Sequence, residues 1–423
     1  MDTRTLLIDS FRAAVGAADP LKIVAAHLPD PPRGRTRVVG AGKAAASMAR
    51  AVELAWPVDA PLDGLVVTRY AHGMPTDRIR VVEAGHPVPD GAGEAAAAEI
   101  LHMAAGLGED DLLIAVVSGG GSSLLSLPVE SVTMADLKAV TSSLLRSGAP
   151  ITEMNIVRKH LSRVQGGRLA AACKSRIVTL IISDVTGDDP SAIASGPTCA
   201  DPSTYQDALD IIARFAVDAP ASVLAHLKAG AAGDVSETPK PGGAELAHAS
   251  NTVIATAHQS LQAAAAFFRA QGITPVVLGD TVTGEASEVA KVYAALAREI
   301  RAHAQPFRPP VALISGGECT VTVRGHGRGG RCAEFLTSLA VELEGMPDVY
   351  AVAADTDGID GTEDNAGALL FPDSPARAAG KGISAAKMLA NNDGYSYFEA
   401  LGDLLVTGPT RTNVNDYRAI LVL

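Results

Sequence analysis

The chain has 423 residues, of which 47% are hydrophobic and 19% charged, and its formal net charge is −12. This length exceeds one ordinary hydrophobic core, so we expect two domains, and the composition excludes a disordered chain. The negative charge excludes sequence-independent nucleic-acid binding, which needs a basic face. No apolar run approaches membrane-spanning length, so no membrane association is expected.

Residues 1–20 predict an amphipathic first helix and no signal peptide. The four cysteines are widely spread and form no CxxC pair, a spacing that suits neither a zinc site nor a disulfide framework. Together these features predict a cytoplasmic protein. The sequence is silent on oligomeric state, and a homodimer is kept as one option.

Short β-branched runs then alternate with alanine-rich segments. The predicted strands are 37–40, 64–69, 79–85, 111–120 and 177–185, and the predicted helices are 43–55, 91–105, 133–147 and 155–172. Continuous apolar strands separated by helices indicate a mostly parallel sheet covered on both faces. The Gly- and Pro-rich stretch 229–250 is the candidate linker, and we expect the first domain to span residues 1–238.

A second set of strands follows at 251–256, 274–280, 310–323 and 348–358. Side chains alternate late in the third of these, which favours an antiparallel excursion. The sequence therefore predicts a smaller, mixed α/β domain over residues 239–423.

The stretch 37–55 runs from a strand through a glycine turn into a helix and carries Lys43 in the turn. Gly40, Gly42 and Ala45 fit a dinucleotide-binding G-x-G-x-x-A pattern, whereas the lysine could serve a phosphoryl group in transfer. The acidic residue that would bind a ribose after the next strand is missing. Arg69 lies near that position and could accommodate the 2′-phosphate of NADP, so NADP is still a candidate ligand.

Two loops follow apolar strands, where ligands of parallel sheets bind. In "SGGGSS" the glycines free the backbone amides to hold a carboxylate or phosphate; its candidate residues are Gly119, Gly120, Gly121, Ser122 and Ser123. In "SDVTGDDPSAIASGPT", residues 183–198, the acidic side chains have a spacing that can hold magnesium; they are Asp184, Asp188 and Asp189.

Basic residues crowd the helical stretch 154–170, which contains Arg158, Lys159, Arg163 and Arg168. Either a ligand-binding face or a solvated basic face accounts for them. In the second domain, a glycine-rich loop after Glu318 carries Arg328 and Arg331, whose guanidinium groups suit phosphate.

These motifs, in this order, resemble those of the glycerate 2-kinase family. Its members end in a MOFRL-type domain and often carry the name hydroxypyruvate reductase. The resemblance runs through "VVGAGKAA", "EAGHPVPD", "SGGGSS", "SDVTGDDPSAIASGPT", "GGRCAEF" and "TGPTRTNVND". It implies a Rossmann-like, three-layer domain with a smaller α/β domain and an active site in the cleft between them. It also implies transfer of phosphate from ATP, with Mg²⁺, to the 2-hydroxyl of D-glycerate.

By resemblance, the catalytic lysine falls on Lys43 and the active-site arginine on Arg331. Cys332 departs from the family pattern, which has Asn there, so a polar contact at this position is in doubt. Further candidate substrate- or nucleotide-binding residues are Ser195, Gly196, Glu318, Arg328, Asn413 and Asn415.

A kinase explains these residues better than an NAD(P)H-dependent hydroxypyruvate reductase, because hydride transfer leaves the carboxylates without a role. A catalytically inactive sugar-acid sensor is a third hypothesis. For the kinase we expect the carboxylate of glycerate on residues 119–123 and Asp189 as the base. The expected magnesium ligands come from Asp184, Asp188, Asp189 and Asp355.

Overall fold

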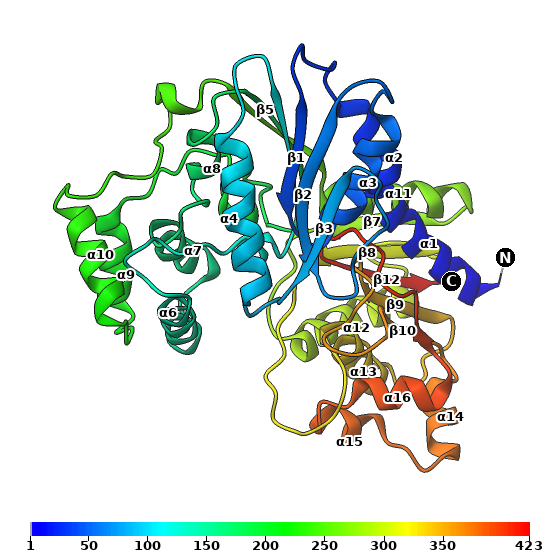
Figure 1. Ribbon diagram of the computed structural model, residues 1–423. Helices are drawn as coiled ribbons and strands as arrows, with labels where there is room; N and C mark the ends of the chain where they lie inside the picture. The colour runs from blue at the N-terminus through cyan, green and yellow to red at the C-terminus, as the bar shows by residue number, and fades with distance from the viewer. Residues whose placement is uncertain (1) are drawn as a thin grey trace. The chain divides into compact units, whose positions relative to one another are not determined.

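The structure is a computed structural model; it describes residues 2–423 and divides into two compact α/β units (Figure 1). The N-terminal unit is Pro20–Ile254, and the C-terminal unit combines Ala255–Leu423 with the chain up to Asp19. The sequence predicts the boundary between residues 238 and 239 instead. The two differ because strand β6 (Ala249–Ala255), which follows the Gly- and Pro-rich stretch, completes the first sheet.

The N-terminal unit contains a six-stranded sheet with the order β3-β2-β1-β4-β5-β6. Its first five strands all pair in parallel, which confirms the predicted sheet. The bounds are β1 Thr36–Ala41, β2 Leu62–Arg69, β3 Ile79–Ala84, β4 Leu112–Val117 and β5 Arg176–Ile182. Beside them lie α2 Pro20–Ile23, α3 Ala45–Ala55, α4 Gly91–Ala105, α5 Gly121–Leu124 and α8 Arg168–Ala171.

A group of helices in the same unit packs around a hydrophobic cluster of its own and lies to one side of the sheet (Figure 1). Its members are α6 Met134–Arg146, α7 Ile151–His160, α9 Tyr205–Arg214 and α10 Ala221–Ala231. The single helix predicted at 155–172 is therefore wrong: α7 and α8 are separate helices. Gly166 and Gly167 adopt left-handed backbone angles, φ 60° and 83°, which a continuous helix excludes.

The C-terminal unit has a second six-stranded sheet, in the order β11-β10-β9-β12-β8-β7. Only β7 and β8 pair in parallel, so the predicted mixed architecture is confirmed. The strands are β7 Thr274–Gly279, β8 Val311–Gly317, β9 Val349–Asp355, β10 Gly367–Leu370, β11 Leu404–Leu405 and β12 Asp416–Val422. The helices are α11 Ala257–Ala270, α12 Ala286–His303, α13 Arg331–Leu343, α14 Ser374–Gly380, α15 Ala385–Ala390 and α16 Gly394–Leu401.

Antiparallel pairing in this sheet does not arise where the sequence predicts it. Strand β8 ends at Gly317 rather than continuing to residue 323. The last strand, β12, supplies the antiparallel pairing because it inserts between β8 and β9.

Both faces of the second sheet are covered, and this explains why the first helix belongs to the C-terminal unit. Alternate residues of β8, β9 and β12 pack on α12 and α13, while their neighbours pack on α11 and on α1 (Thr3–Ala17). From α1, Leu7 and Phe11 are fully buried in that second cluster. Among residues 2–423, no helix combines the length and apolar character needed to cross a membrane.

Candidate active site

Strands β1 and β4 are neighbours at the point where the strand order of the N-terminal unit reverses. The order 3-2-1-4-5-6 is that of doubly wound nucleotide-binding sheets, in which ligands bind beyond the carboxyl ends of the strands at this reversal. Two glycine turns occupy that place here, Gly42–Ala44 after β1 and Ser118–Gly121 after β4. The turns that hold Lys43 and the "SGGGSS" loop therefore lie side by side.

Direct hydrogen bonds join these turns. The amide of Lys43 donates to the Gly119 carbonyl at 2.8 Å, and the amide of Ala44 donates to Ser118 Oγ at 3.0 Å. A Cβ on Gly42 would collide with Ser118, so this glycine makes room for the neighbouring turn. The amide of Ala45 donates to the Gly42 carbonyl. Three consecutive amides at the entry to α3, those of Lys43, Ala44 and Ala45, are thus used within the protein.

The "SGGGSS" loop differs, because several of its amides face no internal acceptor. Within residues 2–423, the backbone N–H groups of Gly119, Gly120, Ser122 and Ser123 make no hydrogen bond. Gly120 has φ 82°, a left-handed angle that favours glycine. Grouped amides of this kind make an anion-binding concavity.

Lys43 and His86 both approach Gly120 closely. A Cβ on Gly120 would lie 3.0 Å from the His86 ring, which is a tight contact, and 3.5 Å from Lys43 Cγ, which is an ordinary one. Burial lowers the pKa of His86 to about 4, with help from the charges of Lys43 and Arg69. The imidazole is therefore neutral at pH 7. Sequence reasoning missed His86, although the motif "EAGHPVPD" that contains it was available.

Opposite the loop, three consecutive residues adopt left-handed backbone angles. They are Ala194, Ser195 and Gly196, with φ of 50°, 59° and 55°. The hydroxyl oxygens of Ser195 and Ser122 lie 2.9 Å apart. The carbonyls of Ser195 and Gly196 accept from Gly166 and Gly167 at 2.9 and 2.8 Å. Ser195 and Gly196 therefore tie the loop to the turn before α8.

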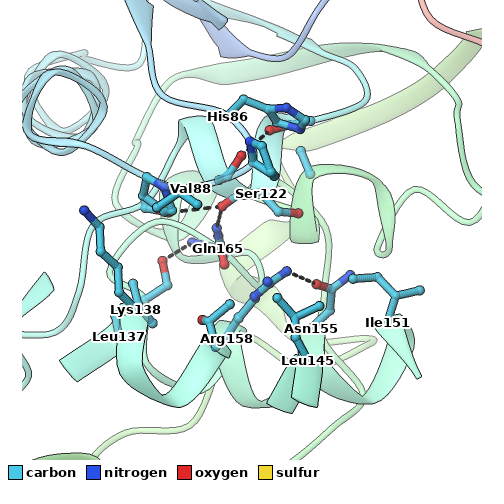
Figure 2. A pocket seen from close by; sticks show the side chains of 18 of the residues that line it. His86, Val88, Ser122, Leu137, Lys138, Leu145, Ile151, Asn155, Arg158 and Gln165 are labelled. Atoms are coloured by element: carbon cyan, nitrogen blue, oxygen red, sulfur yellow. Dashed lines mark hydrogen bonds between the residues drawn. The ribbon is translucent and has the colours of Figure 1, made fainter. Parts of the chain in front are cut away.

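A pocket of about 380 Å³ opens beside this loop, entirely within the N-terminal unit (Figure 2). Its polar lining includes Gly120, Ser122 and Ser123 of the loop, together with His86 and Asp184. Figure 2 shows His86 and Ser122 toward one side and Arg158 and Asn155 of α7 toward the other. Its apolar lining includes Val88, Leu127, Leu137, Leu145 and Ile151.

The three aspartates predicted after β5 take different places. Asp184 lines the pocket, whereas Asp188 and Asp189 are absent from its lining. Asp189 is exposed and accepts from the amide and hydroxyl of Ser191 at 2.8 and 3.0 Å, an arrangement that caps the loop. Across residues 2–423, no three His, Cys, Asp or Glu side chains converge in a way that could hold a metal ion.

In the C-terminal unit, Arg331 lies at the first position of α13 within a group of carboxylates. Its guanidinium contacts Glu318 at 2.9 Å, Asp355 at 2.7 Å and Asp416 at 2.8 Å. Burial lowers the pKa of Arg331, but the three acids outweigh it and the net shift is upward. Asp416 also pairs with the buried Arg418 at 2.7 Å. Arg331 is thus the centre of an extended ion-pair network.

The glycines of the loop before α13 allow this loop to pack closely against residues 391–393 of the same unit. The amides of Arg324, His326 and Arg328 donate to the side chains of Asn392, Asn391 and Asp393. Cβ atoms on Gly325 and Gly327 would collide with the same segment. The Arg328 guanidinium pairs with Glu363 and lies over the Tyr395 ring. This part of the loop supports the protein rather than presenting open amides.

Asn413 and Asn415 are both buried. The Asn413 side chain accepts from the Asn415 amide at 3.3 Å, and the Asn415 carbonyl accepts from Thr356. The Cys332 thiol is fully buried in the apolar cluster below α13, and burial raises its pKa. The neighbouring amides of Cys332 and Ala333 donate to the buried Asp360. The sequence marks Asp360 as one of four aspartates in residues 353–368 but gives it no role, and it does not mark Thr356.

The roles of the predicted site residues, and their assembly in a cleft between domains, stay predictions. Within the N-terminal unit, the structure brings Lys43, the "SGGGSS" loop, Ser195 and Asp184 to one region. Within the C-terminal unit, it brings Arg331, Glu318 and Asp355 together. It leaves Asp189 outside the pocket lining.

Comparison with known proteins yields two family matches and full-length relatives. Residues 6–228 match a domain of unknown function, DUF4147, and residues 311–416 match the MOFRL family. The chain is 52% identical to an Agrobacterium vitis protein provisionally named hydroxypyruvate reductase, over 100% of this chain and 95% of that protein. It is 39% identical to the glycerate 2-kinase of Pyrococcus horikoshii, over 98% and 96% of the two chains.

A crystal structure of glycerate kinase from Thermotoga maritima matches with a TM-score of 0.88 and 36% identity, over 99% of each chain. The resemblance seen in the motifs and the match in fold agree with each other. By motif order, by sequence identity along the whole chain and by fold, the chain belongs to the glycerate 2-kinase family.

Proposed function

We propose that the protein is a glycerate 2-kinase, which transfers the γ-phosphoryl group of ATP to the 2-hydroxyl of D-glycerate. The products are 2-phospho-D-glycerate and ADP. The competing activity is NAD(P)H-dependent reduction of hydroxypyruvate, the name carried by the Agrobacterium vitis relative.

One observation favours the kinase over the reductase. A dinucleotide-binding turn presents the amides at the head of its helix to a pyrophosphate. Here the amides of Lys43, Ala44 and Ala45 already donate to acceptors in the protein. The glycine pattern thus brings two turns together, and it leaves the Lys43 side chain beside Gly120 as the chemically distinctive group.

The unbonded amides of the 119–123 loop are the proposed site for the carboxylate of glycerate. This places the acid beside Lys43 and His86, which both approach Gly120. Lys43 would stabilise negative charge on the transferring phosphoryl group. His86 is neutral at pH 7 and replaces Asp189 as the proposed acceptor of the 2-hydroxyl proton, because Asp189 caps its own loop.

The residues present fit a magnesium ion held mainly by the nucleotide. Mg²⁺ in kinases is bound through one or two carboxylates, phosphate oxygens and water, and Asp184 supplies a carboxylate in the pocket. Asp355 is less suited, since one oxygen pairs with Arg331 and the other accepts from the Asp357 amide. When bound, the ion neutralises charge on the phosphates.

A cytoplasmic location is part of the proposal. All four cysteines are free and buried, as expected in a reducing compartment.

A direct assay tests the proposed function. The protein is incubated with D-glycerate, ATP and Mg²⁺, and the product is offered to enolase, which acts on 2-phosphoglycerate and not on the 3-isomer. NADPH oxidation with hydroxypyruvate is followed in parallel. Enolase-competent product formed at the expense of ATP supports the proposal, and hydroxypyruvate reduction without ATP consumption contradicts it.

A further inference from the structure

The pocket of the N-terminal unit is much larger and more apolar than glycerate requires. A volume of about 380 Å³ is in the range of pockets that hold drug-sized ligands. Glycerate has three carbons, each bearing oxygen, and so has no apolar surface to offer Leu127 or Leu137. Some other ligand, or part of one, must account for this side of the pocket.

Exposed apolar side chains gather at the rim. Val88, Leu145 and Ile151 are 63%, 61% and 59% exposed although they line the pocket. The lining deeper in is mixed, with Ser162 and Gln165 buried beside Leu127 and Leu137. An apolar rim together with apolar and polar groups inside matches a ligand with an apolar end and a polar end.

Two cations line the same pocket without a carboxylate partner. Among residues 2–423, no acid forms an ion pair with Lys138 or Arg158. Within the described part of the chain, the guanidinium of Arg158 bonds only to Asn155 Oδ1, at 3.3 Å (Figure 2). Burial lowers the pKa of Arg158, as expected for a guanidinium that no acid compensates.

Other basic residues of the 154–170 stretch contrast with Arg158. Lys159 pairs with the buried Asp201 at 3.4 Å, Arg163 with Glu130 at 3.8 Å, and Arg168 donates to Tyr205 Oη at 3.0 Å. Those side chains have contacts inside the protein. Arg158 differs because it lines the pocket of the "SGGGSS" loop and its only charged or polar side-chain contact among residues 2–423 is the amide of Asn155, so an anionic ligand would complement its charge.

We infer that this pocket binds the purine nucleotide, with the base against Val88, Leu145 and Ile151 and a phosphate against Arg158. This inference rests on the proposed function, which requires a nucleotide. It adds which side of the site binds that nucleotide. The glycerate carboxylate then stays on the 119–123 amides at the other side of the pocket. The phosphate chain leads from Arg158 toward Gly120, which Lys43 approaches.

Binding measurements test this without depending on turnover. Isothermal titration with ADP and with adenosine is made on the full-length protein and three variants: Leu145→Asp, Arg158→Met and Arg158→Lys. Val58→Asp is the matched control, because Val58 is 97% exposed in the same unit and lies outside the pocket. Leu145→Asp alters an exposed side chain, so the fold should be retained, and circular dichroism checks the fold of every variant.

We expect Leu145→Asp to weaken both ADP and adenosine by about tenfold or more. Arg158→Met should weaken ADP by a similar factor while adenosine is unchanged, and Arg158→Lys should recover part of the loss. Val58→Asp should bind like the wild type. The KM for glycerate of the Leu145→Asp protein should stay unchanged.

Unchanged ADP binding in both Leu145→Asp and Arg158→Met would overturn the inference. A raised KM for glycerate with unchanged ADP binding would also overturn it, since the pocket would then hold the acid. If the protein binds ADP in this pattern yet makes no phosphoglycerate, the nucleotide site stands and the proposed function fails. The two failures are therefore distinguishable.

Discussion

Gly121 and Ala194 approach each other so closely that a side chain at residue 121 would collide with the Ala194 methyl group. A Cβ on Gly121 would lie 2.5 Å from Ala194 Cβ and 3.0 Å from the Ala41 carbonyl oxygen. Ala194 itself has φ 50°, a strained angle for a residue with a side chain. The fold thus accepts strain where it holds the "SGGGSS" loop against residues 194–196.

This contact predicts a destabilising substitution and its rescue. Gly121→Ala should lower stability by about 1–3 kcal/mol through overpacking. Adding Ala194→Gly removes the opposing Cβ and the left-handed strain, so the double variant should recover most of the loss. Chemical denaturation of the two single variants and the double variant measures the coupling. Additive effects would show that the two residues do not interact as described.

Lys43 should matter for turnover. Its amide, which bonds to the Gly119 carbonyl, is unchanged in Lys43→Ala, so the hydrogen bond between the two turns should be retained. Loss of its charge should lower kcat by on the order of 10²–10³. Lys174→Ala, an exposed lysine of the same unit, is the control. A Lys43→Ala protein with near-wild-type kcat would remove Lys43 from the mechanism.

The His86 imidazole should titrate far below an ordinary histidine. Burial and the Lys43 charge lower its pKa to about 4, so a histidine-resolved NMR titration should show a neutral ring from pH 5 upward. Lys43→Met should raise that pKa while burial keeps it below 6.5. A wild-type His86 that titrates near 6.5, or one indifferent to Lys43→Met, would contradict the contact at Gly120.

Arg331 and Arg328 stand three residues apart and should differ sharply in their effect on stability. Arg331→Met removes the guanidinium from the buried Asp355 and leaves Asp416 with Arg418 as its remaining partner, which should cost about 3–5 kcal/mol. The half-exposed Arg328 pairs with Glu363 at the surface, so Arg328→Met should lower the stability far less. Urea denaturation of both variants makes the comparison, and equal losses would argue against a buried network around Arg331.

Asp360 should make the C-terminal unit less stable as pH rises. Burial raises its pKa to about 7, although the amides of Ala333 and Cys332 oppose the shift. The stabilisation from the protonated carboxyl is complete below about 4 and is lost as pH rises through about 7. Relative to Asp360→Asn, the wild type should therefore lose up to about 1.4 kcal/mol per pH unit in this window. A difference that stays constant from pH 4 to 8 would contradict the raised pKa.

Local patterns predicted most of the parallel sheet, because its strands are short apolar runs and most of them alternate with helical segments. The same reasoning placed Lys43 and residues 118–123 beyond strand ends, where the structure has them. It could not assign α1 or β6, since the unit that an element joins depends on which exposed sheet face or edge it covers. No local sequence pattern tells which of the two units such an element joins.

Among site residues, the sequence predicted residue types better than partners. Asp184 and Asp189 look equivalent in the loop after β5, yet one lines the pocket and the other caps a turn. His86 and Arg158 were missed or left open because their significance comes from distant neighbours, Gly120 for the first and an absence of acids for the second. Such relationships exist only once the chain has folded.

Transfer of a labelled phosphoryl group tests the central claim most directly. The protein is given ATP labelled in the γ-phosphate, D-glycerate and Mg²⁺, and enolase is then added. The account predicts that the label passes into phosphoenolpyruvate through 2-phosphoglycerate. Label that stays in an enolase-resistant phosphoglycerate, or in ATP while NADPH reduces hydroxypyruvate, would contradict it.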